Sequence, residues 1–242
     1  MDHTPEESTQ LPLLARSTGQ LLNDFGAGKA SPGSGSAAAL MGLLAAKLLN
    51  TVCDKSLTKA ECRSNGRVLE YIKEQVHAVE PRLIELFEKD AREFDEVVAL
   101  RIARDQAESV QDKSKLSRQS QELLETATEN AFHIIELCMK LIDHGVVVFE
   151  SGWRAIRGDS GAALSAAIAG VMSGIFIANL NIKTLKGRKY AAENVNRCDE
   201  LYKELSAKQA RAFACVTSLN AEAIASIQVD LDGIQDRAES TG

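Results

Sequence analysis

Residues 31–50 have the sequence SPGSGSAAALMGLLAAKLLN, a loop of small residues that runs directly into an apolar helix. Glycine and serine leave the loop backbone accessible, so its N–H groups are able to approach a ligand or a partner. The N-terminus of the following helix adds a partial positive charge. Its many alanines allow neighbouring helices to come close. This stretch therefore predicts a binding site placed against a packed helical core.

The whole chain has the composition of a helical protein. Its 242 residues are 45% hydrophobic and 5% aromatic, which predicts an aliphatic, alanine-rich core. All four prolines lie in the first third of the chain, so no proline interrupts a helix after Pro81. Runs of alternating β-branched residues are few. The sequence therefore predicts an all-α fold, an elongated bundle of about six to seven helices.

Capping residues, glycines and the apolar periodicity set the expected boundaries. We expect a disordered leader at residues 1–10, one helical domain at residues 11–230 and a flexible tail at residues 231–242. The expected helices span residues 11–24, 36–54, 58–79, 81–107, 115–143 and 160–185, and a last one runs from residue 189 past residue 219. In this scheme Pro81 opens a helix, Gly145 and Gly187 each end one, and Asp159 caps one.

Charge, cysteine and histidine usage exclude several classes of function. The net charge of −6 argues against general nucleic-acid binding. The five cysteines have neither CxxC nor His/Cys spacing, which is typical of reduced core thiols in a cytoplasmic protein. His133 and His144 stand eleven residues apart on one helix, too far to share a metal ion. We therefore predict no metal site.

Residues 160–182 carry no charge and include the pattern Gly170-x-x-x-Gly174, so a membrane span has to be considered. Polar residues such as Asn179 and Asn181, together with charged helices on both sides, favour a buried bundle helix instead. A second helix, residues 36–53, is similarly apolar. Two such helices in one bundle predict that a partner subunit covers one of them.

Asp90 is the strongest catalytic candidate because it interrupts an apolar stripe on the helix expected at residues 81–107. The stripe consists of Leu83, Leu86, Phe87, Phe94, Val97 and Val98, at spacings of three and four. A carboxylate in such surroundings is costly unless it is paired or protonated, and desolvation raises its pKa toward a range useful for proton transfer. Two interpretations stay open: a general acid/base, or a buried aspartate that only bonds a helix end or a lysine.

Three segments in register resemble the formimidoyltetrahydrofolate cyclodeaminase / methenyltetrahydrofolate cyclohydrolase family. Residues 31–39 resemble its Pro-Gly-Gly-Gly-Ser-x-Ala-Ala start. Residues 90–94, Asp-Ala-Arg-Glu-Phe, resemble its Asp-Ala-x-x-Phe helix, and residues 152–163 with the uncharged helix that follows resemble its third block. The order and spacing agree from about Leu13 to Leu205.

The resemblance implies an all-α homodimer with a folate site in a cleft at or near the dimer interface. It implies a tetrahydrofolate derivative as substrate and no metal or redox cofactor, and it matches Asp90 to the proposed catalytic aspartate of the family. The positions that the resemblance places at the ligand are Gly33, Ser34, Gly35, Ser36, Lys59, Phe94, Trp153, Arg157, Asp159 and Asn181. Lys59 falls where the family often carries Arg or Lys, which suits a glutamyl tail; from the residues alone, a solvated helix end is the alternative.

Four positions depart from the family pattern. Ser34 replaces the middle Gly of the loop, Trp153 stands where the family usually has Asn, Gly158 replaces a Ser, and Ile177 replaces the first of two Asn residues. Three hypotheses therefore stay open. The chain is a cyclodeaminase, a cyclohydrolase or both; or a relative acting on a different folate or on a small amidine or formyl compound; or a non-catalytic helical dimer that binds a ligand or a partner.

Overall fold

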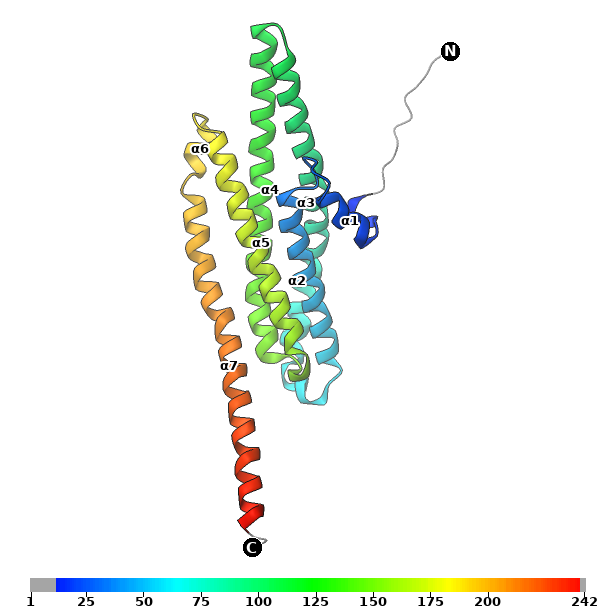
Figure 1. Cartoon of the computed structure of the whole chain (residues 1–242), viewed down its shortest axis with the longest axis vertical. Coiled ribbons are helices and arrows are strands. Elements are labelled where there is room, and N and C mark those ends of the chain that lie inside the picture. Colours follow the sequence, from blue (N-terminus) through cyan, green and yellow to red (C-terminus); the bar gives the residue numbers. More distant parts are fainter. Residues whose placement is uncertain (1–11, 240–242) are drawn as a thin grey trace, which may run out of the picture.

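The computed structural model describes residues 12–239, with side chains described as far as residue 228. Four long helices form the core: α2 (Ser34–Leu57), α3 (Gly66–Gln106), α4 (Val110–Ser151) and α5 (Arg157–Thr184). Each packs against its neighbours in an up-and-down bundle, and α7 (Arg197–Glu239) lies along the outside of α4 and α5 (Figure 1). The described residues contain seven α-helices and no strand, which confirms the predicted all-α fold.

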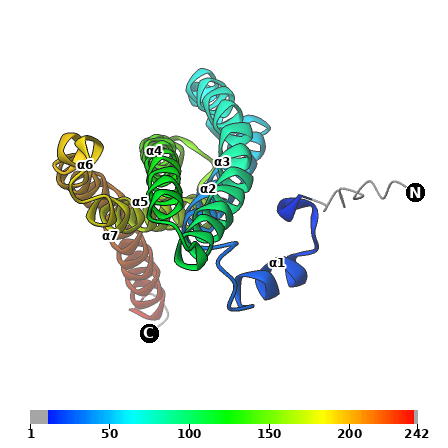
Figure 2. The ribbon, with the colours of Figure 1, turned by 90° about the horizontal axis from the view of Figure 1, so that it is seen from above.

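Smaller elements connect the long helices. The remaining helices are α1 (Thr18–Phe25) and α6 (Lys189–Asn194), with 3-10 turns at Leu13–Ala15, Ala60–Asn65 and Arg154–Ile156. Seen along the bundle, α1 stands on one side, beyond α2 and α3, while α6 and α7 lie on the other (Figure 2). The expected leader, residues 1–10, lies outside the described residues. The expected tail begins at residue 231, where the backbone continues as helix α7 to Glu239.

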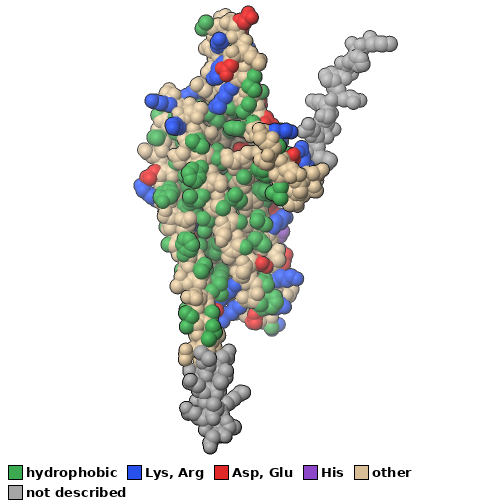
Figure 3. Space-filling view, in the orientation of Figure 1, with side chains coloured by type: hydrophobic (Ala, Val, Ile, Leu, Met, Phe, Trp, Pro, Cys, Tyr) green, Lys and Arg blue, Asp and Glu red, His purple; other side chains and the backbone are tan. Residues whose placement is uncertain are grey.

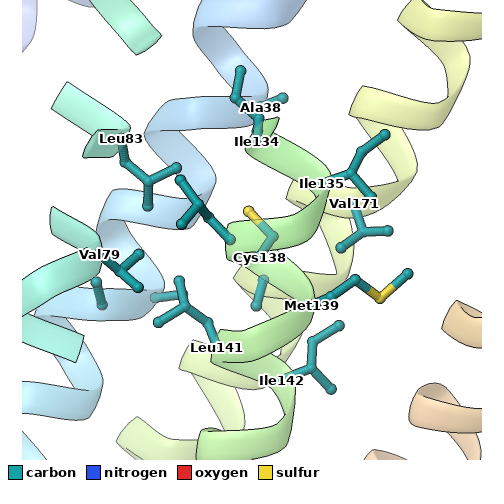
Figure 4. Packing of buried hydrophobic residues seen from close by; sticks show 14 of the residues in the cluster. Ala38, Val79, Leu83, Ile134, Ile135, Cys138, Met139, Leu141, Ile142 and Val171 are labelled. Atoms are coloured by element: carbon teal, nitrogen blue, oxygen red, sulfur yellow. The ribbon is translucent and has the colours of Figure 1, made fainter. Parts of the chain in front are cut away.

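The small residues of α2 and α5 let these helices approach α4 closely, as predicted. Cys138 of α4 lies in the buried core (Figure 4). A Cβ atom added at either Gly42 or Gly170 would lie 2.8 Å from its sulfur atom, and one at Gly170 would also lie 3.1 Å from the carbonyl oxygen of Ala38. Burial raises the pKa of the Cys138 thiol to about 12, so this cysteine is a neutral core residue.

The expected helix break at Pro81 is wrong: α3 runs through it without interruption. The ring of Pro81 is exposed, whereas the buried stripe continues on both sides of it, from Val76 and Val79 to Leu83. An interior proline costs about 3 kcal/mol or more. Burying large aliphatic side chains contributes roughly 1.5–3 kcal/mol each, so a continuous stripe offsets that cost.

The expected limits of α4 are also wrong at both ends. Ser109 caps the helix by accepting a hydrogen bond of 3.0 Å from the backbone N–H of Asp112, so the helix starts at Val110, before the expected residue 115. At the other end Gly145 does not stop the helix, which continues to Ser151. A Cβ at Gly145 would lie 2.7 Å from a Leu164 methyl group, so this glycine provides room for α5.

Other boundaries shift as well, and the helix expected at residues 58–79 begins only at Gly66, after the 3-10 turn at Ala60–Asn65. The expected helix at residues 11–24 is a 3-10 turn followed by α1, which Ser17 and Gln20 start with a capping box. Helix α5 begins at Arg157, so Asp159 lies in its first turn and is not its cap. The last expected helix divides into α6 and α7 between Asn194 and Arg197.

Helices α2 and α5 are long and apolar enough to cross a membrane by length and composition. The bundle buries 61% of the most apolar stretch of α2 and 44% of the most apolar stretch of α5. Both contact three other long helices, which is what a core helix of a bundle does. Much of the apolar surface of α5 nevertheless stays outside the core, including Phe176 and Leu180.

Candidate active site

A cavity of ≈ 370 Å³ lies beside the N-terminus of α2. Helix α2 begins at the level of Asp90, whereas α3 and α4 continue past it (Figure 1), so no helix fills that space between α3, α4 and α5. The cavity is lined by Ala30, Gly33, Ser34, Gly35, Asp90, Phe94, Arg101, Leu124, Ala127, Ile177, Leu180, Asn181 and Thr184.

Asp90 joins α3 to the first turn of α2. The Ser36 hydroxyl donates a hydrogen bond of 3.0 Å to Oδ2 of Asp90, and its oxygen lies 3.3 Å from the carbonyl oxygen of Phe87. A Cβ atom at Gly35 would overlap the Asp90 carboxyl group, so only glycine leaves room for it there. Gly35 and Ser36 in the first turn of α2 thus have separate functions: Gly35 leaves room for the carboxyl group and Ser36 binds it.

Two opposing effects act on the pKa of Asp90. Burial dominates and raises the pKa above its ordinary value, because the side chain is only 9% exposed. Hydrogen bonds from the hydroxyl and the backbone N–H of Ser36 act in the other direction and stabilise the carboxylate. A carboxyl group held in this way is able both to accept and to return a proton.

A second carboxyl group lies one turn further along α3. Glu93 accepts a hydrogen bond from the side-chain amide of Asn130 on α4, and Lys89 lies 3.6 Å from the other Glu93 oxygen. Lys89 also donates to the Asn130 amide oxygen at 3.2 Å. Burial raises the pKa of Glu93, and the charge of Asp90 raises it further. This cluster fixes α3 against α4 beside the Asp90 carboxyl group.

Seven of the eleven predicted site residues come together at this end of the bundle. Six of them line the cavity: Gly33, Ser34, Gly35, Asp90, Phe94 and Asn181. Ser36 completes the group through its bond to Asp90. Ile177, the departure from the family pattern on the uncharged helix, also lines the cavity.

The other four, Lys59, Trp153, Arg157 and Asp159, lie at the opposite end of the bundle. The length of α2 separates them from Asp90 by about 30 Å, at 1.5 Å per residue. The Lys59 ammonium lies 3.9 Å from the centre of the Trp153 ring, and the Ser56 hydroxyl accepts a hydrogen bond of 2.8 Å from the backbone N–H of Trp153. These four do not reach the Asp90 cavity of their own chain.

Arg157 has a structural environment of its own. It forms an ion pair of 3.0 Å with Glu222 of α7, donates to the Phe149 carbonyl oxygen and lies 4.9 Å from the Phe149 ring. These contacts make Arg157 the partner of an acid on a neighbouring helix within its own chain. The departures at Trp153 and Gly158 likewise lie away from the cavity.

Sequence reasoning missed several cavity residues, of which Arg101 has the most chemical consequence. It follows Asp90 by eleven residues, about three turns, so both lie on one face of α3. The apolar stripe was followed only to Val98, and extending it by one turn finds Arg101. Nothing in the sequence distinguishes Leu124 and Ala127 of α4 from the other apolar residues of a core helix.

Among the described residues, no group of three or more His, Cys, Asp or Glu side chains is placed to hold a metal ion. The five cysteines are all buried and free. The cavity itself offers one carboxyl group, one guanidinium and three neutral polar side chains, those of Ser34, Asn181 and Thr184, with apolar walls between them. This arrangement suits proton transfer on a partly aromatic, anionic small molecule.

The chain is similar to known proteins in both sequence and fold. The model of the formiminotransferase-cyclodeaminase family matches residues 17–200. A methenyltetrahydrofolate cyclohydrolase from Methylorubrum extorquens is 28% identical over 189 residues, which cover 78% of this chain and 89% of that protein. The structure of a formiminotetrahydrofolate cyclodeaminase from Thermotoga maritima matches the fold with a TM-score of 0.73 at 16% identity, over 86% of this chain and 98% of the other.

Proposed function

Because the chain belongs to the formiminotransferase-cyclodeaminase family, we propose that it catalyses one-carbon chemistry on a tetrahydrofolate derivative, with the Asp90 cavity as its active site. The observation that carries this proposal is the buried Asp90 carboxyl group, bonded to Ser36 at the edge of a cavity with apolar walls. The named activity of the Methylorubrum relative supports a folate substrate. We place the enzyme in the cytoplasm, consistent with its five free cysteines.

Both candidate reactions take place at the carbon between N5 and N10 of the folate. In the cyclodeaminase reaction N10 attacks the formimidoyl carbon, a proton leaves N10, and ammonia departs from the carbon with a proton gained. In the cyclohydrolase reaction water adds to the methenyl carbon and loses a proton. One C–N bond then breaks as its nitrogen is protonated, and the hydroxyl group on the carbon loses its proton to become the formyl oxygen. Each reaction needs one group that moves a proton over a short distance, and Asp90 provides it.

The raised pKa of Asp90 suits this function. A carboxyl group with an ordinary pKa is a weak proton donor near pH 7, whereas one with a raised pKa is protonated for a larger share of the time. Ser36 holds the carboxyl group in position, and the α2 N-terminus stabilises its charged form between proton transfers.

The test is turnover of two substrates by the purified chain. With 5-formimidoyltetrahydrofolate we expect the methenyl chromophore to appear together with free ammonia; with 5,10-methenyltetrahydrofolate we expect that chromophore to fade. The faster of the two reactions identifies the principal activity. A folded protein that turns over neither substrate contradicts the proposal.

We also propose that the enzyme is a homodimer in which α5 forms part of the interface. Phe176 and Leu180 lie one turn apart on α5 and are 65% and 63% exposed. Apolar side chains gather over this face of the molecule (Figure 3). Since Leu180 also lines the cavity, a partner that covers this face closes the site on that side. Lys59, Trp153, Arg157 and Asp159 lie at the opposite end of the bundle from Asp90. They contact the ligand only if a second copy brings its own set of these residues to the cavity.

Ile177 favours a second candidate function. It places an aliphatic side chain in the cavity where the family pattern has an amide. An amide hydrogen-bonds polar substrate atoms, whereas isoleucine does not. The alternative is therefore a different folate, or a small amidine or formyl compound, and turnover of such a compound in the absence of folate turnover would establish it.

A further inference from the structure

Arg101 lines the same cavity as Asp90, on the same face of α3. A separation of eleven residues corresponds to about 16 Å along the helix and a rotation of only ~20°. Between the two charged groups the cavity wall is apolar, made by Phe94 on α3 together with Leu124 and Ala127 on α4. The cavity therefore has a carboxyl group at one end, a guanidinium group at the other and an apolar passage between them.

The guanidinium group of Arg101 differs from those of the other partly or fully buried arginines in the described chain. The other five, Arg16, Arg104, Arg157, Arg188 and Arg197, each form an ion pair with a carboxylate. Arg101 is half-buried, and no hydrogen bond or ion pair joins it to any described residue. A partly desolvated cation without a partner is costly, so its place in a cavity points to an anion supplied from outside the chain.

We propose that Arg101 binds a carboxylate of the substrate's glutamyl group. This inference rests on the proposed function, since it takes the ligand to be a folate with its reacting carbon at Asp90. By ordinary bond lengths, about 10 Å separate the N10 nitrogen from the glutamyl carboxylates, and an arginine side chain spans a further ~6 Å. The sum matches the separation of the two residues along α3. The aminobenzoyl ring then lies against Phe94 and Leu124.

A guanidinium group suits this function better than the ammonium of Lys59. It binds a carboxylate through two parallel hydrogen bonds and thereby fixes the position of the ligand as well as its charge. Lys59 lies at the far end of the bundle against Trp153, so within one chain Arg101 is the cation that reaches this cavity. The proposal makes Arg101 a specificity residue that touches the substrate far from the reacting atoms.

The experiment combines a substitution with a truncated substrate. Arg101→Ala is compared with the unchanged protein on 5,10-methenyltetrahydrofolate and on the corresponding methenyltetrahydropteroate, which lacks the glutamyl group. We expect Arg101→Ala to raise KM for the folate by about 10- to 100-fold with little change in kcat. KM for the pteroate should stay within about twofold, because there is no carboxylate left to bind. Arg101→Lys should recover part of the loss.

Arg104→Ala is the matched control. Arg104 is also half-buried, but it lies outside the cavity lining and pairs with Asp105. It should leave KM for both substrates unchanged. An equal rise in KM for folate and pteroate would show a merely structural effect of Arg101 and would overturn the proposal, as would an unchanged KM for the folate.

A binding measurement separates this inference from the proposed function. N-(4-aminobenzoyl)-L-glutamate and 4-aminobenzamide are titrated calorimetrically into the unchanged protein and into Arg101→Ala. Binding of the first compound alone, lost in Arg101→Ala, supports the inference even if no folate is turned over. If the unchanged protein turns over folate but both proteins bind the two fragments equally, the proposed function stands and the assignment of Arg101 is wrong.

Discussion

Asp90 is held in a position that favours chemistry over stability. Its carboxyl group is buried, and Ser36 supplies the hydrogen bond that burial requires. We predict that Asp90→Asn lowers kcat by about 10²- to 10⁴-fold, the usual loss when a general acid/base is removed. Asparagine keeps an oxygen for Ser36 and a similar shape, so circular dichroism should stay unchanged. Asp95→Asn, an exposed carboxylate on the same helix, is the control and should keep full activity.

The same substitution should change the pH dependence of stability. The pKa of Asp90 is higher in the folded chain than in the unfolded chain, so ionisation at neutral pH opposes folding. This destabilising contribution is complete above the folded pKa and vanishes below the unfolded value of about 3.9. Asp90→Asn should therefore have a higher Tm than the unchanged protein at pH 7, and this difference in Tm should shrink as the pH falls toward 4. A difference that grows with acidification would mean that the folded pKa is lowered.

Gly35 determines whether the carboxyl group fits. A methyl group at this position overlaps Asp90, so Gly35→Ala must displace either the carboxyl group or the first turn of α2. We predict that kcat/KM falls by at least about tenfold, because a catalytic group displaced by 1 Å loses up to about 100-fold in rate. Gly19→Ala in α1, where a Cβ meets nothing within 4 Å, should keep kcat/KM. Full activity of Gly35→Ala would contradict the position assigned to Asp90.

At the scale of the helices, glycines decide how closely α2, α4 and α5 pack. Gly170→Ala would place a Cβ 2.8 Å from the Cys138 sulfur and 3.1 Å from a backbone oxygen of α2. Overpacking of this kind costs about 1–3 kcal/mol. Since each kcal/mol shifts Tm by roughly 2–4 °C in a chain of this size, we expect a lower Tm by several degrees in calorimetry.

Two further variants test the cause of that loss. Gly161→Ala lies in the same helix with open space around it, so it should hold or raise Tm, since alanine favours helix by up to about 1 kcal/mol. Adding Cys138→Ala to Gly170→Ala should recover part of the lost Tm by removing the nearer clash. A Gly170→Ala protein as stable as Gly161→Ala would mean that the helices separate at no cost.

The sequence predicted the type of these elements well and their ends less well, for reasons visible in particular residues. Pro81 and Gly145 are strong local signals for helix ends, yet both lie inside long helices. The exposed ring of Pro81 disturbs only the solvent side of a continuous buried stripe, and Gly145 accommodates Leu164. Whether a helix continues through such a residue depends on which helix packs against it. The apolar periodicity of one segment does not identify that neighbouring helix.

The site divides in the same way. The family resemblance predicts Asp90, Gly35 and Ser36 at one ligand, and these three residues do meet. Lys59 and Trp153 were predicted at the same ligand but lie about 30 Å away along α2. Motifs in register along the chain do not specify at which end of an antiparallel bundle each one lies. That information comes from helix direction and length.

For the whole molecule, the open question is what covers the outer face of α5. Phe176 and Leu180 are both more than half exposed, and Leu180 is part of the wall of the Asp90 cavity. An apolar cavity wall that faces water leaves the site wet, which weakens every electrostatic interaction within it. In the homodimer that we propose, a second copy packed over α5 would remove that water, so assembly and catalysis should depend on each other.

We predict that Phe176→Glu weakens the dimer by about 100-fold or more, because it places an unpaired charge in the interface. Phe176 does not line the cavity, so any loss of activity has to come from the missing partner. Sedimentation velocity should show a dimer for the unchanged protein and a monomer for the variant at micromolar concentration, and kcat/KM should fall as the dimer dissociates. Tyr71→Glu, at another aromatic residue that is more than half exposed, on α3, should leave both the dimer and kcat/KM unchanged. A fully active Phe176→Glu monomer would separate the active site from the interface and make each chain catalytically complete.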